Sequence, residues 1–258
     1  EHNIIGSQPA DVRRSAEQAV KALNWRAEYF IDADHINLKT VPNFIESSDF
    51  FTLDVADAIG EPADENVIHE FLKFAAKYTR PFTIPGIVQR IEVDQHSIEK
   101  IARKYLVAVL SAAVTYHYIQ DNCKHDFVVE LSVDETDIPQ SPLELFFILA
   151  MAAWQKLPLA TIAPKFSGRF NKGIDYVGDP AKFANEFSQD IAVVDFAMHE
   201  FALPEGLKLS VHSGSDKFSL YPHIHQIIMK SGAGLHLKTA GTTWLEELIG
   251  LAAADGDG

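Results

Sequence analysis

Polar side chains crowd the end of one short apolar run in the chain. The run LKLSV (207–211) is typical of a buried strand, and the residues directly after it include His212, Ser213, Asp216 and Lys217. Polar groups removed from water cost free energy unless they bind ions, hydrogen-bond or do chemistry. A strand that ends in such a set of groups is therefore a candidate for the edge of an active site.

Other apolar runs end in the same way. Chemically active side chains at their carboxyl ends are Asp32, Asp34 and His35, then Asp54, then Glu130, Ser132 and Asp134, then Lys165 and Arg169, and finally His236, Lys238 and Thr239. The carboxyl ends of parallel strands meet at one edge of a sheet, where α/β proteins build their active sites. Any one of these residues could be a helix cap or a packed core group, so the inference rests on their convergence.

Three histidines at these predicted strand ends point to a metal ion. His35, His212 and His236 are the candidate ligands, with Asp34 and Glu130 nearby in the predicted arrangement. Imidazole and carboxylate are the usual ligands of catalytic divalent ions, and such sites accept Mn, Zn, Co or Ni. The sequence therefore predicts a divalent-metal site and leaves the choice among these ions open.

Two acids are the candidates for proton transfer. Glu130 lies between apolar neighbours, so burial is expected to raise its pKa toward that of a general base, unless a metal or a lysine lowers it. Asp34 follows Asp32 by two positions, which places both on one side of an extended strand. Asp32 could instead orient a histidine. Acids beside a metal suit proton transfer next to a carbonyl or hydroxyl group.

Cations at the strand ends describe the substrate. The chain is acidic overall, with a formal charge of −14 at pH 7, so cations gathered at one edge are informative. They predict an anionic or hydroxyl-rich small molecule, such as a carboxylated sugar. A Schiff base on Lys165 or Lys238 is an alternative, but the histidines favour the metal. The predicted substrate-binding residues are Asp32, Lys165, Arg169, Ser213, Ser215, Asp216, Lys217, Lys238 and Thr239.

Strand-like runs and helical patterns alternate along the chain. The strand-like runs are 27–36, 49–56, 126–136, 159–166, 207–216 and 234–242, with a weak one at 82–84. The helical patterns are 10–24, 41–47, 64–79, 95–120, 141–156, 180–200, 220–231 and a last one from Thr243. The alternation predicts one α/β domain over 1–258, mainly helical at about 60–122. We expect a (β/α)8 TIM-type barrel with missing or incomplete terminal elements; an open doubly wound sheet fits too.

Composition narrows the class of protein. The 258 residues are 47% hydrophobic, enough for a sizeable core, and the acidic charge excludes a nucleic-acid partner. One cysteine excludes an intrachain disulfide and a cysteine-based zinc site. With no secretory leader pattern and no membrane span, we expect a cytoplasmic protein. The oligomeric state is left open.

Four motifs together resemble the tagaturonate epimerase family. They are DADHI (32–36), SDFFTLDVAD (48–57), HSGSDKFSLYP (212–222) and GLHLKTAGTTWLEE (234–247), and the resemblance extends over about 28–250. The family consists of metal-dependent enzymes that interconvert tagaturonate and fructuronate, and some members act on fructose and tagatose as 4-epimerases. Its chains are longer than this one.

The resemblance implies a fold and a site. The fold is a (β/α)8 barrel with a divalent ion at its C-terminal mouth. Matched by motif, His35, His212 and His236 look like the metal ligands, while Asp34 and Glu130 look like the acid/base pair. Glu130 could instead be a fourth ligand.

The substrates imply a mechanism as a hypothesis. The two hexulosonates differ at a carbon β to the ketone, so the ketone does not acidify its C–H bond, and a retro-aldol route fits better than deprotonation. A metal-dependent sugar isomerase or a class II-type aldolase is an alternative enzyme. An alternative from another class is a non-catalytic barrel that binds sugar acids.

Overall fold

The computed structural model describes residues 6–238, and these form one parallel sheet with helices outside it. The strands are β1 (Asp32–Ile36), β2 (Phe50–Asp54), β3 (Val128–Ser132), β4 (Leu159–Ala163), β5 (Lys208–Val211) and β6 (Leu235–Leu237). Each lies within one of the six strong runs predicted from the sequence. Their near-continuous apolar cores suit strands that are covered on both faces.

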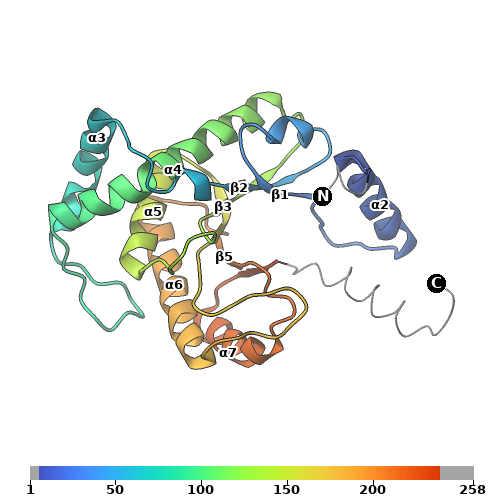
Figure 1. The fold of residues 1–258 in the computed structure, drawn as a ribbon. Coiled ribbons are helices and arrows are strands. Elements are labelled where there is room, and N and C mark those ends of the chain that lie inside the picture. Colours follow the sequence, from blue (N-terminus) through green and yellow to red (C-terminus); the bar gives the residue numbers. More distant parts are fainter. Residues whose placement is uncertain (1–5, 239–258) are drawn as a thin grey trace.

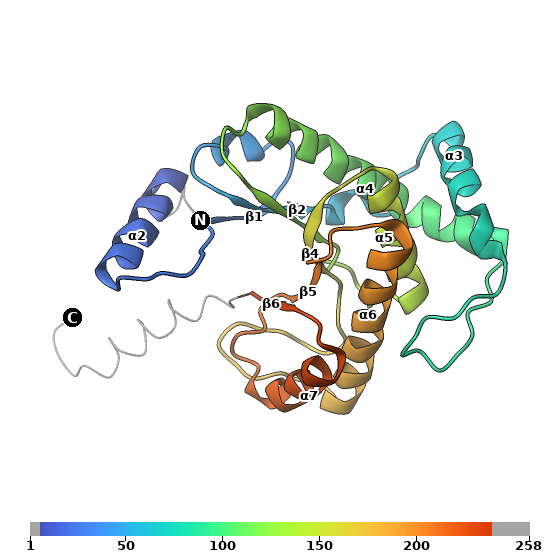
Figure 2. The ribbon, with the colours of Figure 1, turned by 180° about the vertical axis from the view of Figure 1, so that it is seen from behind.

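The strand order decides between the two expected architectures. The order is β1-β2-β3-β4-β5-β6, and every neighbouring pair is parallel. A doubly wound sheet reverses its strand order at a switch point, and no reversal occurs among the described residues. The sheet instead curls as part of a barrel wall (Figures 1 and 2). Within 6–238 it has six strands, so the fold is a partial barrel rather than a complete (β/α)8 barrel.

Helices connect the strands. They are α2 (Pro9–Ala22), α3 (Glu65–Ala75), α4 (Gln95–Asn122), α5 (Pro142–Trp154), α6 (Pro180–Phe201) and α7 (Tyr221–Ser231), with short 3-10 turns at Val41–Asn43, Ala56–Ala58, Ala76–Thr79 and Phe218–Leu220. Helices α4, α5, α6 and α7 lie along the outer side of the curled sheet (Figure 1). Each helical pattern predicted within 6–238 is present, although 41–47 shortens to a 3-10 turn. The helix predicted from Thr243 lies outside the described residues.

Local sequence explains where the helices begin and what they bury. Ser141 precedes α5 and forms a capping box with Glu144, while Asp94 and Asp179 accept backbone N–H groups at the starts of α4 and α6. Helix α5 is apolar nearly all round, and eight of its residues are buried. Such a helix is stable only in a core, and it packs between α4 and α6.

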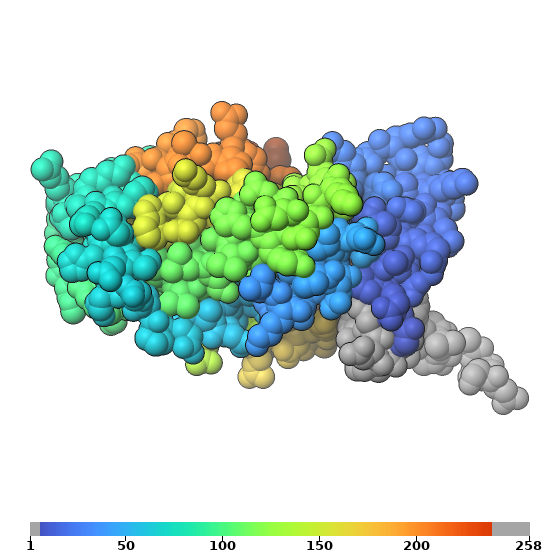
Figure 3. Space-filling model, turned by 90° about the horizontal axis from the view of Figure 1, so that it is seen from above, coloured from blue at the N-terminus to red at the C-terminus, as the bar shows by residue number. Residues whose placement is uncertain are grey.

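Of the mainly helical segment at about 60–122, the part before α4 lies at one end of the molecule, and α4 runs from there along the sheet (Figure 3). Tyr78 is one of its residues in the core, and its ring packs against Phe146, Phe147 and Phe201. Figure 3 shows its teal residues at the end opposite the blue N-terminal residues. The prediction of a weak strand at 82–84 is wrong. Phe82 forms only an isolated antiparallel bridge with Ile91 and is not part of the parallel sheet. Among the described residues, no helix is long and apolar enough to cross a membrane.

Candidate active site

The carboxyl end of β1 turns sharply and re-aims two side chains. The pairing of β1 with β2 shifts register between Ala33 and Ile36, and His35 has a positive φ of 50°. A left-handed residue in a β-bulge is unusual for histidine and often marks a functional site. Asp34 accepts a hydrogen bond from Nδ1 of His35 at 2.7 Å. The bulge thus presents an acid and an imidazole together at the sheet edge.

Three side chains from separate strand ends form a group with metal-ligand spacing. Ligand atoms of His35, Asp134 and His212 all lie within 4.8 Å of one another. Oδ2 of Asp134 is 3.1 Å from Nδ1 of His212, and Oδ1 of Asp134 is 3.9 Å from Nε2 of His35. Ser132 donates to the Asp134 carboxylate at 2.5 Å and orients it. Two imidazoles and a carboxylate are a suitable donor set for a divalent transition-metal ion.

The buried acid Glu130 fixes the proton position on His212. Nε2 of His212 donates to Oε1 of Glu130 at 2.7 Å, so in the neutral imidazole Nδ1 is the nitrogen that carries the lone pair. Nδ1 is buried and makes no hydrogen bond, although Asp134 is close by. Nδ1 of His212 thus lies beside an oxygen of Asp134 without a hydrogen bond between them. This is the arrangement expected of two atoms that bind the same metal ion. A carboxylate behind a ligating histidine is the usual support for such a ligand.

Glu130 stands at the centre of a buried polar network. Its side chain is 0% exposed and accepts hydrogen bonds from Thr161 at 2.5 Å and Thr52 at 3.4 Å. Burial favours its neutral form, but hydrogen bonds from His212 and His236 and the charge of Lys238 hold its pKa well below its usual value. The sequence-based expectation allowed for a lysine that lowers this pKa, and Lys238 does so, but the histidine hydrogen bonds, which the expectation did not include, contribute more.

Lys238 ties β6 to the acids of β1. Its ammonium group lies 2.9 Å from Asp32 and 2.7 Å from Asp34, and it donates to Thr52 at 2.5 Å. The predicted common side for Asp32 and Asp34 is thus confirmed. Burial raises the pKa of Asp32 despite Lys238, whereas His35 and Lys238 hold the pKa of Asp34 low against its burial.

The cluster has more negative than positive charge. Four carboxylates, Asp32, Asp34, Glu130 and Asp134, lie around Lys238 and the histidines. Interactions with Asp134 and Asp34 raise the pKa of His35 to about 10. Burial lowers the pKa of His212, but Asp134 and Glu130 outweigh this and raise it to about 9. Such surroundings attract a cation, and a divalent ion fits them with both imidazoles neutral.

His236 is placed differently from the prediction. Its Nδ1 lies 3.0 Å from Glu130 and 3.1 Å from the Ser210 hydroxyl, and its ring packs on Phe50. It is not part of the group with metal-ligand spacing among the described residues, and Asp134 takes that place. The sequence placed Asp134 among the acids at strand ends. Its position in the metal-ligand group depends on the turn after β3, which the sequence pattern did not predict.

A pocket of about 340 Å³ opens beside the metal-ligand group. Lys165, Arg169 and Ser213, three of the residues predicted to bind substrate, line it together with Asp134 and His212. Asp32 and Lys238 lie in the neighbouring charged network. The pocket lining therefore combines two cations with two residues of the metal-ligand group.

The other predicted substrate-binding residues lie elsewhere. Asp216 and Lys217 form an ion pair with each other away from the pocket lining, and both are buried. The Ser215 carbonyl accepts a hydrogen bond from Tyr221, and Ser215 does not line the pocket. Thr239 lies outside the described residues.

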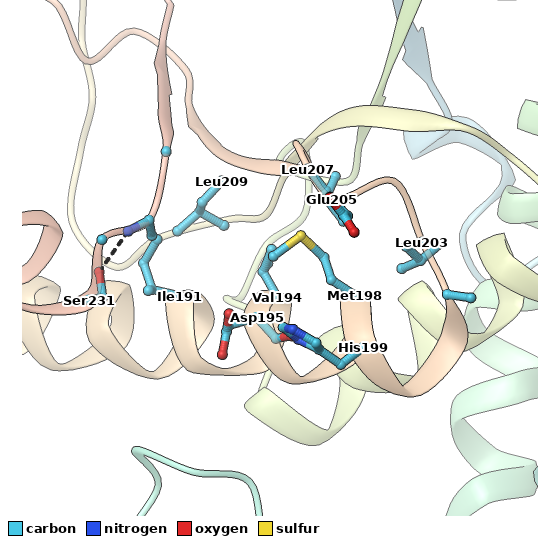
Figure 4. A pocket seen from close by; sticks show the side chains of 14 residues that line it. Ile191, Val194, Asp195, Met198, His199, Leu203, Glu205, Leu207, Leu209 and Ser231 are labelled. Carbon is cyan, nitrogen blue, oxygen red and sulfur yellow. Dashed lines mark hydrogen bonds between the residues drawn. The ribbon is translucent and has the colours of Figure 1, made fainter.

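A second hollow lies at the opposite edge of the sheet. It measures about 680 Å³ and lies between α6 and the amino ends of β5 and β6 (Figure 4). Figure 4 shows Met198 at its centre, with Leu207 and Leu209 opposite. Its polar groups, Asp195, His199 and Glu205, form no group with metal-ligand spacing among the described residues. Size alone therefore does not locate the site.

Comparisons with known proteins agree with this geometry. A family model described as tagaturonate epimerase matches residues 1–257. A tagaturonate/fructuronate epimerase from Thermotoga maritima is 30% identical over 258 residues, which cover 95% of this chain and 51% of that protein.

Solved structures give the same result. The native fructuronate-tagaturonate epimerase from Cohnella laeviribosi superposes with a TM-score of 0.75 at 27% identity, over 93% of this chain and 50% of that one. A glycerol complex of the same protein gives a TM-score of 0.75 at 26% identity, over the same shares. The chain thus spans about half the length of these relatives. Because the family model matches nearly the whole length of this chain, the chain belongs to the tagaturonate epimerase family.

Proposed function

We propose that the site is the catalytic centre of an epimerase that interconverts tagaturonate and fructuronate. The observation that carries this proposal is the meeting of His35, Asp134 and His212 at the sheet edge beside a cation-lined pocket. The names of the relatives supply the substrate pair. Fructose and tagatose are proposed as neutral substrates of the same site.

Three residues would hold the metal. His35, Asp134 and His212 offer two imidazole nitrogens and a carboxylate oxygen, and Glu130 fixes the orientation of His212. His236, the third predicted histidine, supports Glu130 instead of the ion. Mn, Zn, Co and Ni all accept these ligands. A bound divalent ion supplies Lewis-acid stabilisation of negative charge on substrate oxygens.

Asp34 is the group best placed to take a proton from the substrate. Its side chain is 61% exposed, and His35 and Lys238 keep it ionised. It removes the proton of the hydroxyl group at the reacting carbon, and the electron pair forms the aldehyde as the adjacent C–C bond breaks. The other fragment becomes an enediolate. After the aldehyde rotates, the enediolate attacks its opposite face, and the alkoxide recovers the proton.

Glu130 would take part in proton transfer only through its neighbours. It is fully buried, so no substrate atom reaches it directly. Lys238 contacts both Asp34 and Glu130, at 2.7 and 3.4 Å, and links the two predicted acid/base residues. Glu130 keeps Lys238 and His212 in place while Asp34 exchanges the proton. The predicted acid/base pair thus acts as one exposed and one buried member.

The cations of the pocket would bind the acid end of the substrate. Lys165 and Arg169 line the same pocket as His212 and Asp134. A guanidinium and an ammonium group bind a carboxylate by charge-assisted hydrogen bonds. A hexulosonate would therefore bind more tightly than a neutral ketohexose.

The test is metal-dependent turnover by the full-length protein. The protein is stripped with chelator, single divalent ions are added, and tagaturonate and fructose are followed by NMR. We expect the epimer to appear with at least one ion. Asp134→Asn should weaken metal binding by about 100-fold or more. Substituting a residue that only hydrogen-bonds to a metal ligand already lowers metal affinity about 10–100-fold, and Asp134 would be a ligand itself. Asp137→Asn, an exposed acid three positions on, is the control. No turnover with any ion would refute the proposal.

Product analysis separates the proposal from its alternatives. An aldolase releases both fragments in stoichiometric amounts, whereas an epimerase returns an isomer of equal mass. Traces of a released three-carbon aldehyde would support C–C cleavage. Incorporation of solvent deuterium at the epimerised carbon, with no such aldehyde, would contradict it. Sugar-acid binding without turnover would favour the non-catalytic barrel.

A further inference from the structure

One wall of the pocket is a long segment between β4 and α6. Residues 164–179 contain both pocket cations, Lys165 and Arg169. The segment doubles back on itself, because Arg169 and Val177 pair antiparallel through two backbone hydrogen bonds. The directions of both cations therefore depend on what holds this segment in place.

A tyrosine packed between glycines fixes the base of the segment. The Tyr176 ring lies so close to Gly168 and Gly178 that a Cβ atom at either position would come within 2.5 Å of it. Gly168 also has a φ of +88°, which L side chains rarely adopt. The Tyr176 hydroxyl donates to the Ser167 carbonyl at 2.8 Å. The base of the segment is thus closely packed.

A buried lysine holds the tip of the segment from outside. Lys217 is 0% exposed and donates to the carbonyls of Asn171 at 2.8 Å and Ile174 at 2.9 Å, and to the Asp216 carboxylate. Asp216 in turn accepts the Gly173 N–H at 2.8 Å. An ammonium group has three N–H donors, and these three acceptors use all of them. Lys217 therefore has no donor left for a ligand.

The position of this ion pair links two loops of the site. Lys217 and Asp216 follow β5 in the same turn as His212, whereas the carbonyls that they hold belong to the loop after β4. A buried ion pair adds little net stability against apolar replacements, and its best-attested use is to fix one arrangement. Here the arrangement that it fixes is that of the pocket wall relative to the metal-ligand group.

We propose that Lys217 and Asp216 are positioning residues that hold the 164–179 segment so that Arg169 and Lys165 face the substrate carboxylate. This inference rests on the proposed function and revises the predicted direct contact of Lys217 and Asp216 with substrate. The 164–179 segment carries none of the three metal-ligand residues, and His212, which shares the turn after β5 with the ion pair, is held separately by Glu130. Loss of the tie then affects binding of the acid end and leaves the metal site intact.

The first experiment separates KM from kcat. In Lys217→Met/Asp216→Asn, which removes both buried charges together, we expect KM for tagaturonate to rise about tenfold, the loss of one charge-assisted hydrogen bond. The kcat value and the manganese affinity should change less than about twofold. The lost contacts bind the acid end of the substrate equally in the ground state and the transition state, so their loss raises KM without lowering kcat. Lys172→Met, an exposed lysine of the same segment, is the matched control and should leave KM unchanged.

A double-mutant cycle with Arg169→Gln tests the route of the effect. If Lys217 acts through Arg169, adding the two changes to Arg169→Gln should raise KM little further. Fully additive effects, or an unchanged KM in the charge-pair variant, would overturn the proposal. The neutral fructose should show a smaller KM change than tagaturonate in the same variant.

Hydrogen exchange makes the inference independent of turnover. In the charge-pair variant, amides of 164–179 should exchange at least about tenfold faster, while those of β3 stay protected, because the tie is local. Faster exchange throughout the protein would mean a general structural role and would overturn the proposal. If the wild-type protein is inactive but the charge-pair variant still shows faster exchange only in 164–179, the proposed function is refuted. The role of Lys217 and Asp216 in holding this segment is then still supported.

Discussion

Two buried acids show how differently the same burial acts in the sheet edge and in the helix layer. Glu130 in β3 is 0% exposed, and Asp190 in α6 is 4% exposed. Two histidines and Lys238 surround Glu130 and hold its pKa well below the usual value despite burial. Burial and the like charge of Glu186 raise the pKa of Asp190 well above the usual value.

The comparison shows that the charge of a buried acid depends on the groups that contact it and not only on how deeply it is buried. Desolvation favours the neutral form of both groups. At Glu130, cationic and hydrogen-bonding partners reverse this preference, so a negative charge is available beneath the metal-ligand group. At Asp190, desolvation and the like charge of Glu186 act in the same direction, and both favour the neutral form. The first acid lies beside the proposed catalytic group, whereas the second lies in the helix layer away from it.

The largest expected contrast between the two acids is in metal affinity. Glu130→Gln removes the carboxylate that orients His212, so we expect manganese affinity and turnover to fall 10–100-fold, the usual cost of losing such a partner. Asp190→Asn should leave both unchanged. Calorimetric titration of the chelator-stripped protein measures the affinity. Equal losses in the two variants would mean that Glu130 matters only as a buried acid.

Stability should change in the opposite direction for Asp190. Asn resembles the protonated acid, so Asp190→Asn should increase the free energy of unfolding at pH 8, on the order of 1–2 kcal/mol. The folded-state pKa of Asp190 is raised. Its stabilising contribution is therefore present below the unfolded-state pKa and is lost as pH rises through the folded-state value.

The pH dependence is the sharper half of that prediction. The gain from Asp190→Asn should be small near pH 4 and grow as the pH rises toward 8. Urea unfolding of the two proteins at both pH values measures it. A gain of the same size at pH 4 and pH 8 would mean that the substitution acts through packing and not through the proton.

The sequence predicted the strands and the site edge because both depend on local patterns. Apolar runs of strand length ended in polar groups, and the six strong runs became the six strands within 6–238. The pocket positions of Lys165 and Arg169 followed from the same rule. Strand order was not predictable in this way, since a doubly wound sheet and a barrel share the same alternation of elements.

The charge state of Glu130 could not be read locally. Its partners His212 and Lys238 lie 82 and 108 residues away in the sequence, and only the folded sheet brings them together. The ligand position of Asp134 likewise depends on a turn. By contrast, Asp190 had a local signal. It lies three residues after Phe187 and four before Val194, on the buried face of a helical pattern.

The smallest expected effect tests whether the hydroxyl groups around Glu130 contribute to its low pKa. Thr161 donates to Oε2 of Glu130 at 2.5 Å, so Thr161→Val should lower the free energy of unfolding by about 1 kcal/mol. Thr115→Val is the matched control. That buried hydroxyl donates to the Ser111 carbonyl within α4 and touches no acid of the site.

Metal affinity should separate these two threonine variants more clearly than stability does. A carboxylate that loses one of several donors still orients His212, so Thr161→Val should weaken manganese binding by a few-fold, less than Glu130→Gln. Thr115→Val should leave it unchanged. If both variants lose stability equally and neither alters manganese binding, the hydroxyl groups only fill the core. The charge of Glu130 would then depend on His212, His236 and Lys238 alone.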